Sequence, residues 1–181
     1  MKIVAALTCS LALLVGLSSV QAGDGIVLDG LTSKLPEGWK MQKPSNNLRK
    51  YQAMIPKVDG DKEDAELAVF SFGASGVDEN IKRWKMQFIA PEGKTIEESS
   101  KVEKFKIGSV ADVVVLDIWG TFKYRFPPND PRAEEKRKEN FRRFNVMFMT
   151  DKSTYFLTLT GPARTMDKNK AAFDSWIKGF K

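Results

Sequence analysis

The sequence predicts an α+β fold in which an antiparallel β-sheet has helices packed against it. Segments with the alternating or continuous apolar pattern of strands occur on both sides of a segment with helical periodicity. A second amphipathic segment ends the chain, and short connections rich in turn residues separate neighbouring strand segments. Strands that follow one another in this way favour antiparallel pairing, with the two helices placed against the sheet.

The first half of the predicted domain begins with a tether or an edge strand in the short, Gly-rich segment 23–33. Residues 49–55 alternate between apolar and polar side chains, and Pro56 ends this strand. A second strand is expected at 65–72, after the acidic segment 59–64. The two strands therefore form a β-hairpin with an acidic tip.

The hydrophobic period changes after this hairpin. Val77, Ile81, Trp84 and Phe88 follow one another at intervals of four, three and four residues, which places them on one face of a helix. Pro91 stops the segment. The sequence thus predicts a helix that packs this apolar stripe against the sheet.

Strands resume in the second half, at 101–107 and 110–122. Residues 113–116 are apolar without alternation, which predicts a central strand that is covered on both faces. Two further strands at 144–149 and 155–159 form another antiparallel pair. After them, a closing helix presents one apolar face made of Ala172, Phe173, Trp176, Ile177 and Phe180.

The N-terminus has the pattern of an export signal. Lys2 supplies a positive charge, residues 3–17 are almost continuously apolar, and small residues lead up to Ala22. A transmembrane anchor is the alternative, but the apolar run is shorter than the ~20 residues needed to cross a bilayer. We therefore expect a signal peptide at 1–22, cleavage near Ala22, a secreted protein in the periplasm or outside the cell, and one globular domain at 23–181 without a transmembrane segment.

The chain contains no histidine, and its one cysteine, Cys9, lies in the predicted signal. The commonest general base, the commonest metal ligand and the thiol nucleophile are therefore all missing from residues 23–181. We expect no catalytic residues, no metal site and no cofactor. Without a disulfide, stability must come from packing around Trp39, Trp84, Trp119 and Trp176.

The most charged connection in the chain is 123–143, which we expect to be a hairpin arm between two core strands. Its candidate binding residues are Arg137, Lys138, Arg142 and Arg143, and its prolines are Pro127, Pro128 and Pro131. Such an arm suits a phosphate, an acidic lipid headgroup or an acidic protein face. Alternatively, it is a solvated loop that protects a sheet edge. Acidic residues interleave with the basic ones, which argues against nucleic acid as the partner.

The predicted first helix carries a second candidate binding rim. Asn80, Arg83 and Gln87 share one helical face beside Trp84, so that Arg83 and Trp84 could bind a partner together. The alternative is that Trp84 belongs to the core and the polar residues tie the helix to its neighbours.

Carboxylates offer two weaker possibilities. The acidic segment 59–64 suits calcium, although a hairpin tip is the better interpretation because the spacing differs from that of an EF-hand loop. Glu103, Asp112 and Asp117 could form a carboxylate pair for glycoside hydrolysis if they lie close together.

Four segments carry a resemblance: AELAVF at 65–70, FG at 72–73, NIxRWxxQF at 80–88 and YFLxLxGP at 155–162. They resemble a group of uncharacterised exported bacterial proteins, and the order of elements is similar to the PsbP-like α/β/α sandwich of the extrinsic photosystem II subunit. The resemblance implies this fold and an accessory or binding role. A photosystem role is not implied, because the chain has no histidine for a metal site.

Together these features predict an exported, non-enzymatic accessory protein that binds a protein or another anionic component of the cell envelope. The net charge, which falls from +6 to +5 when Lys2 is removed with the signal, favours anionic partners. A protein that binds a small hydrophobic ligand or lipid, with Trp84 lining the pocket, is the alternative. A carboxylate-based hydrolase is a third, weaker one.

Overall fold

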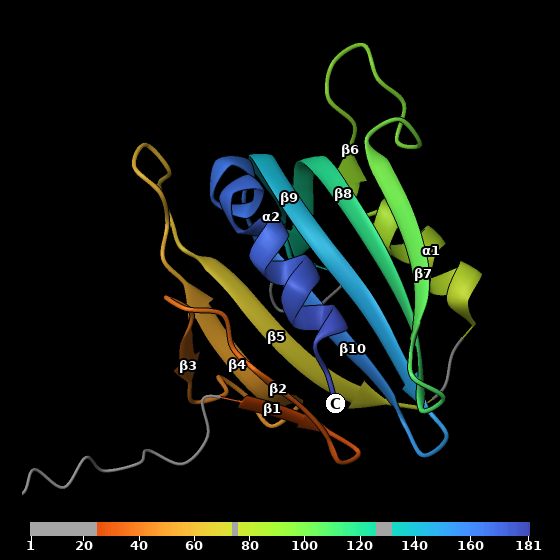
Figure 1. Cartoon of the computed structure of the whole chain (residues 1–181). Coiled ribbons are helices and arrows are strands. Elements are labelled where there is room, and N and C mark those ends of the chain that lie inside the picture. The colour runs from red at the N-terminus through yellow and green to blue at the C-terminus, as the bar shows by residue number, and fades with distance from the viewer. Residues whose placement is uncertain (1–24, 74–75, 126–131) are drawn as a thin grey trace, which may run out of the picture.

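The structure is a computed structural model that describes residues 25–73, 76–125 and 132–181 (Figure 1). The first strands are β1 (Gly25–Leu28), β2 (Leu31–Lys34), β3 (Lys40–Gln42), β4 (Arg49–Ile55) and β5 (Ala65–Phe72). They are followed by helix α1 (Val77–Lys85) and by β6 (Phe88–Ile89), β7 (Ser100–Ile107), β8 (Ala111–Arg125), β9 (Glu135–Thr150), β10 (Thr154–Pro162) and helix α2 (Ala163–Lys178). The predicted signal peptide, 1–22, and the three prolines Pro127, Pro128 and Pro131 lie outside the described residues.

The main sheet is antiparallel, with the strand order β3-β4-β5-β10-β9-β8-β6, and β7 also pairs with β8. Helix α2 lies on one face of this sheet and α1 on the other (Figure 1). The predicted α+β class, with helices against an antiparallel sheet, is therefore confirmed. Neither helix of the described part of the chain has the length and apolar character needed to cross a bilayer.

Most predicted strands are present, but two are much longer than the sequence indicated. Strand β8 continues to Arg125, and β9 begins at Glu135 instead of residue 144. In these added parts the two strands pair with each other at the edge of the molecule, with mostly half-buried or exposed side chains. Because such a ribbon does not bury one whole face, its sequence lacks the apolar alternation that identifies a strand.

Short elements account for the other differences. The segment predicted as a tether or an edge strand forms the β1–β2 hairpin, in which Thr32 exchanges backbone hydrogen bonds with Lys181. Helix α1 ends at Lys85, so Phe88 belongs to strand β6 and not to the predicted helical face. The chain leaves the helix here because the carbonyl of Gln87 accepts a backbone hydrogen bond from Lys123 of β8 (2.8 Å).

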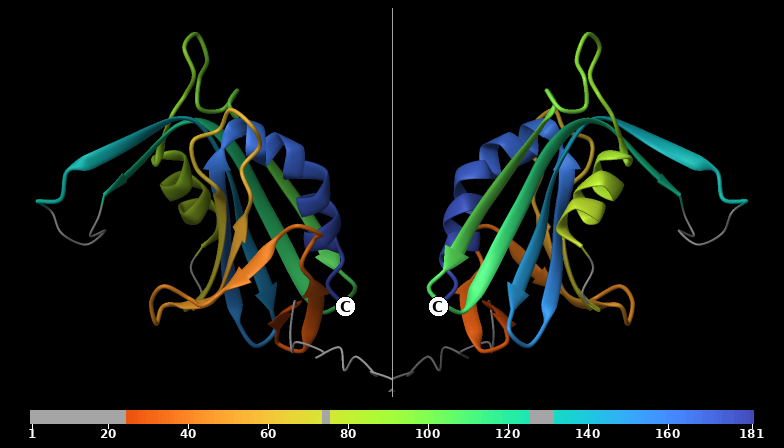
Figure 2. Two further views of the ribbon diagram at one scale, coloured as in Figure 1. Left: turned by 90° about the vertical axis from the view of Figure 1, so that its left-hand side faces the viewer. Right: turned by 90° about the vertical axis from the view of Figure 1, so that its right-hand side faces the viewer.

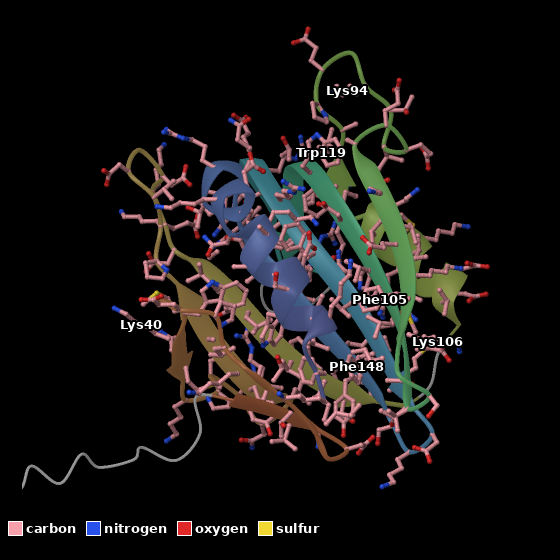
Figure 3. All side chains as sticks on the ribbon, in the orientation of Figure 1. Lys40, Lys94, Phe105, Lys106, Trp119 and Phe148 are labelled. Carbon is pink, nitrogen blue, oxygen red and sulfur yellow. The ribbon has the colours of Figure 1, made fainter. Side chains whose placement is uncertain are left out.

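The larger core lies between the sheet, α2 and the β1–β2 hairpin. Phe173 of α2 packs on Phe144 of β9 with ring centroids 4.5 Å apart, and Trp176 lies 5.8 Å from Trp39. Both tryptophans are buried, as expected. Trp119 of β8, in contrast, is only half-buried, and Lys94 lies 6.0 Å from its ring centroid (Figure 3).

A smaller core lies between α1 and the opposite face of the sheet. Trp84 of α1 is 5% exposed and meets the ring of Phe156 edge-on, with centroids 6.4 Å apart. Val114 and Leu116 of β8 belong to this core, whereas Val113 and Val115 belong to the larger one. The prediction that 113–116 is covered on both faces is thus confirmed.

The outer ends of β8 and β9 form an arm that projects from the body on the side of α1 (Figure 2). A bulge at the base of this arm shifts the register, so that Gly120 pairs with Phe141 but Phe122 pairs with Lys138. Gly120 has φ 145° and Asn140, in the partner strand, has φ 55°. Bulges increase the local twist and bend of a strand, which accounts for the change of direction.

A polar contact holds the β1–β2 turn against the main sheet. The carboxylate of Asp29 accepts hydrogen bonds from the hydroxyls of Thr150 (2.5 Å) and Tyr155 (2.8 Å). The hydrogen bond from Thr150 is the main cause that holds the pKa of Asp29 below its ordinary value of 3.8, with a further contribution from Tyr155.

Replacement of Gly120 is predicted to damage the base of the arm. A Cβ at this position would lie 2.2 Å from the carbonyl oxygen of Ile89, and the positive φ is unfavourable for any other residue. Gly120→Ala should therefore lower the free energy of unfolding by about 2–3 kcal/mol in denaturant titrations. Gly73→Ala is the control, since a Cβ there meets nothing within 4 Å. Equal stability of the two variants would contradict the proposed bend.

The contact at Asp29 predicts a pH dependence of stability. A carboxyl whose pKa is lowered by folding stabilises the protein above its unfolded pKa, and this contribution is lost as the pH falls through the folded pKa. Wild type should therefore be more stable than Asp29→Asn at pH 7, and the difference should shrink below about pH 4 as Asp29 becomes protonated. Thermal melts of both proteins between pH 7 and pH 3 measure this difference, and a constant difference would be evidence against it.

Candidate functional site

An open cleft of about 500 Å³ lies on the α1 face of the sheet, next to the area that the helix covers. Its floor contains small side chains: Ala68 of β5 and Thr158 and Thr160 of β10. Longer side chains from β3, β4, β9 and the arm surround them. The hollow exists because Trp84 of α1 packs on Phe156 of β10. The neighbouring part of β5 and β10 therefore has no helix over it among the described residues.

The register of the sheet places the floor residues in two rows that cross the strands, and the second row continues into buried residues that do not line the cleft. The first row runs from Arg143 through Thr160 to Glu66. The second runs from Asn145 through Thr158 to Ala68 and then to Gln52 of β4. Since residues paired directly across antiparallel strands point to the same face, each row brings polar groups from distant parts of the sequence together.

One end of the floor is a closed polar network around Glu66. Its Oε1 lies 2.8 Å from Nη1 of Arg49, and its Oε2 accepts a hydrogen bond from Nε2 of Gln52 (3.0 Å). Gln52 also accepts a hydrogen bond from the backbone N–H of Ser45 (2.9 Å). Both oxygens of Glu66 therefore have partners within the protein. The Nε and Nη1 of Arg49, in contrast, are buried without a hydrogen bond among the described residues, so the contact of Nη1 with Glu66 is an ion pair only.

Arg143 lies at the other end of the floor, and its hydrogen-bond acceptor is neutral. Its Nη1 donates a hydrogen bond to the neutral amide oxygen of Gln87 (2.7 Å), and its guanidinium lies 5.0 Å from the ring centroid of Phe122. The Nε is buried and has no acceptor among the described residues. Burial lowers the pKa of Arg143 to about 10, so the side chain still carries its charge at neutral pH. The site thus holds a cation that lacks an acidic partner within salt-bridge distance in the described structure.

Asn145 adds unsatisfied hydrogen-bonding groups beside this cation. It is completely buried, two residues along β9 from Arg143, and it lies opposite Thr158. Neither Oδ1 nor Nδ2 has a partner among the described residues. Buried polar groups normally have hydrogen-bond partners, and unsatisfied groups next to a cleft therefore merit a functional explanation.

The arm forms one wall of the cleft through Phe122, Tyr124, Lys138 and Phe141. The ammonium of Lys138 lies 5.6 Å from the ring centroid of Tyr124 and 5.1 Å from that of Phe141. Lys138 also forms a salt bridge with Glu63, which precedes β5. This salt bridge connects the arm to the β4–β5 connection, so two segments 75 residues apart in the sequence border the same cleft.

The four basic residues predicted as one surface occupy different surroundings. Lys138 and Arg143 line the cleft, whereas Arg137 pairs with Lys123 on β8 and donates to Glu135 near the exposed end of the arm. Arg142 lies on the α2 face, because adjacent residues of a strand point to opposite faces. The structure therefore brings together only Lys138 and Arg143 of the four.

Arg142 has a complete set of acidic partners. Its Nε and Nη2 donate to the two carboxylate oxygens of Asp117 (2.8 and 2.6 Å), and Nη1 donates to Asp167 of α2. Although burial opposes the charge, the hydrogen bonds to these carboxylates hold the pKa of Arg142 above its ordinary value. The bidentate pair with Asp117 connects β9 to β8, and the hydrogen bond to Asp167 connects β9 to α2. Arg142 therefore stabilises the fold and is not available to a partner.

The helix residues predicted as a binding rim are likewise separated. Trp84 is buried in the smaller core. Arg83 is exposed and donates to Oδ1 of Asn80, which is itself buried. Gln87, beyond the end of the helix, reaches Arg143 instead. The core alternative for Trp84 agrees with this placement.

The carboxylates do not assemble into a hydrolytic pair as proposed. Asp112 and Asp117 are an odd number of residues apart on β8 and point to opposite faces; Asp112 pairs with Lys106 and Asp117 with Arg142. Glu103 lines a small pocket with Asp117, but it is paired with Lys178.

The acidic segment 59–64 is the connection of the β4–β5 hairpin, as the hairpin interpretation predicted. Asp61 accepts hydrogen bonds from the backbone N–H and the hydroxyl of Thr165, in the first turn of α2 (2.9 and 2.6 Å). The carboxylate thereby satisfies donors at the start of the helix. Within the described residues, no group of three or more potential ligands is arranged to hold a metal ion.

Comparison with known proteins adds no assignment. No protein-family model matches the sequence, and no curated protein has significant similarity to it.

The sequence did not identify Arg49, Glu66, Thr158 or Thr160 as site residues. A signal was present, because Glu66 and Ala68 alternate with buried Leu67, and the two threonines flank buried Leu159. This alternation shows that the second face of each strand is polar or small. It does not show that these faces are adjacent.

The two neighbouring arginines should differ in their effect on stability. Arg142→Met removes the partner of Asp117, whose side chain is 10% exposed, and should lower the free energy of unfolding by about 3 kcal/mol. Arg143→Met removes a cation that lacks an acidic partner and should leave stability unchanged or raise it by up to about 1 kcal/mol. Urea unfolding of both variants makes the comparison, and a larger loss in Arg143→Met would contradict the assignment.

Proposed function

We propose that this chain is an exported, non-enzymatic binding protein that recognises the carboxylate of an anionic ligand or partner in the cleft at the base of the arm. The observation that carries the proposal is the state of Arg143. It is a charged group with a buried, unused donor in a cleft that is open to solvent. A buried charge without a counter-ion is costly, and an anion bound beside it reduces that cost.

Arg143 is also held in place before any ligand arrives. The hydrogen bond to Gln87 and the ring of Phe122 restrict its guanidinium on two sides. A side chain that is already ordered loses less conformational entropy when it binds. The planar guanidinium also suits a carboxylate, whose two oxygens match its parallel donors.

The other cations of the cleft are largely neutralised by the protein. Arg49 is paired with Glu66, and Lys138 is paired with Glu63. Asp64 also lines the cleft, so the lining is neutral overall, and a ligand with one negative charge is favoured locally at Arg143, which has no carboxylate within salt-bridge distance among the described residues. This supports the expectation of an anionic partner and shifts its binding site from the whole 123–143 arm to the cleft at its base.

The layered arrangement of helix, sheet and helix supports the resemblance to the PsbP-like α/β/α sandwich, and with it an accessory role. Export rests on the N-terminal signal pattern in the sequence. A carboxylate-bearing component of the cell envelope is thus the partner that the combined features favour.

The test measures binding of a simple carboxylate to the purified protein. Propionate should raise the melting temperature of wild type relative to sodium chloride at equal ionic strength, because a ligand that binds the folded state stabilises it. Arg143→Gln should abolish this shift.

Arg137→Gln is the matched control, since it makes the same change on the same strand, at an exposed residue outside the cleft. It should keep the full propionate effect. An equal shift in wild type and Arg143→Gln would refute the assignment of Arg143.

A second candidate function has one specific observation in its favour. A groove of about 720 Å³ beside α1 is lined by Ile81, Met86, Phe88 and Ile96, with Lys82, Lys85 and Lys123 around it. These groups suit a small hydrophobic ligand or lipid with an anionic end. Binding of dodecanoate that is weakened by Met86→Glu and unaffected by Arg143→Gln would support this alternative.

A further inference from the structure

We propose that the ligand of the cleft is a sugar acid, in which one carboxylate binds Arg143 and the hydroxyl groups bind Thr158 and Thr160. The inference rests on the proposed function and specifies its ligand class. A free sugar acid and a uronate residue within an acidic polysaccharide share this chemistry.

Neutral polar groups lie next to Arg143 in the cleft. Thr160 lies opposite Arg143 in the β9–β10 register, and Thr158 lies opposite Asn145. Both threonines are half-buried and line the cleft, and the described residues give neither hydroxyl a hydrogen-bond partner. Asn145 adds an unsatisfied amide behind them. A ligand with hydroxyl groups near its carboxylate would satisfy these groups, whereas a purely apolar acid would leave them unpaired.

The aromatic rings that line the cleft are in contact with cations. Each ring of the cleft already has a cation near it: Arg143 at Phe122, Lys138 at Tyr124 and Phe141, and Arg49 at Phe70 (5.0–6.0 Å to the ring centroids). The rings therefore position cations, and less of their surface remains for an apolar ligand. The lining consequently favours a polar ligand body.

The charges that line the cleft are balanced overall, with Arg49, Lys138 and Arg143 on one side and Glu63, Asp64 and Glu66 on the other. Glu66 and Glu63 form salt bridges with Arg49 and Lys138, so Arg143 is the lining cation without a carboxylate within salt-bridge distance among the described residues. Asp64, also in the lining, is exposed and accepts a hydrogen bond from the backbone N–H of Lys57. An additional carboxylate near the cleft opposes a second negative charge on the ligand. One carboxylate per sugar is thus a better match than a phosphate dianion.

The size and shape of the cleft agree with such a ligand. Its volume of about 500 Å³ lies within the range of roughly 300–1,000 Å³ that is common for small-molecule sites. The cleft is open along one side of the sheet, so that both a free sugar acid and a residue of a longer chain have access.

The experiment is isothermal titration calorimetry with D-glucuronate, D-glucose, propionate, phenylacetate and a tri-uronide. Wild type should bind D-glucuronate about tenfold or more tightly than propionate and phenylacetate, because the hydroxyl groups add hydrogen bonds. D-glucose, which lacks the carboxylate, should bind at least about tenfold more weakly than D-glucuronate. Tighter binding of the tri-uronide than of D-glucuronate would identify a polysaccharide as the source of the ligand, and equal binding would identify the free sugar acid.

Thr158→Val removes one hydroxyl at nearly constant volume. It should weaken D-glucuronate binding by about tenfold and leave propionate binding unchanged, a pattern that a general loss of folding would not produce. Thr154→Val is the matched control, because Thr154 lies on the same strand and the same face but outside the cleft. It should leave both affinities unchanged.

The outcomes separate the two proposals. If phenylacetate binds as tightly as D-glucuronate, or if Thr158→Val leaves their ratio unchanged, the sugar-acid inference is wrong while the carboxylate site at Arg143 stands. If neither propionate nor D-glucuronate binds wild type, or if Arg143→Gln binds them equally well, the proposed function fails and the inference fails with it.

Discussion

The long antiparallel pairing of β8 with β9 positions both cores and the cleft. It begins with Ala111 opposite Thr150, passes through the centre of both cores, and ends in the arm with Arg125 opposite Glu135. The same two strands therefore supply the covered centre of the sheet and one wall of the cleft. The bulge at Gly120 divides these two parts, because it changes the register where the strands leave the body. A continuous straight ribbon would carry Phe122 and Lys138 away from the sheet and leave the cleft without this wall.

Alternation along β9 explains how one sequence motif serves two purposes. Arg142 and Arg143 are neighbours, yet one faces α2 and the other faces the cleft. Arg142 meets two carboxylates and connects three elements, whereas Arg143 meets a neutral amide and an aromatic ring. The first arrangement satisfies the charge within the fold. The second leaves it available to a ligand, and proteins commonly accept such a local loss of stability at functional sites.

The cleft lies where α1 leaves part of one face of the sheet uncovered. The helix ends at Lys85, and its Trp84 packs beside Phe156 on β10. Two and four residues further along that strand, Thr158 and Thr160 replace large apolar side chains, and no helix lies over them among the described residues. Small polar residues on the floor and long polar residues around it produce a hollow with hydrogen-bonding groups at its base. The apolar groove on the other side of α1 differs in having Ile81, Met86 and Phe88 in its lining, which is why the two sites favour different ligands.

The class of the fold, the order of the main elements and the two-sided burial of 113–116 could be predicted from the sequence, because these depend on hydrophobic periodicity within short segments. The sequence also indicated the arm, and it identified Lys138 and Arg143 among its candidates. The three-dimensional packing was needed to show that Arg142 is neutralised by Asp117 and that Asp112 and Asp117 point to opposite faces. It also chose between the binding and the core interpretations of Trp84. Likewise, only the register across β9, β10 and β5 places Arg143, Thr160 and Glu66 in one row. These residues are separated by up to 94 positions, from Glu66 to Thr160. No local pattern encodes their contact, because the strand register arises from the packing of the whole sheet.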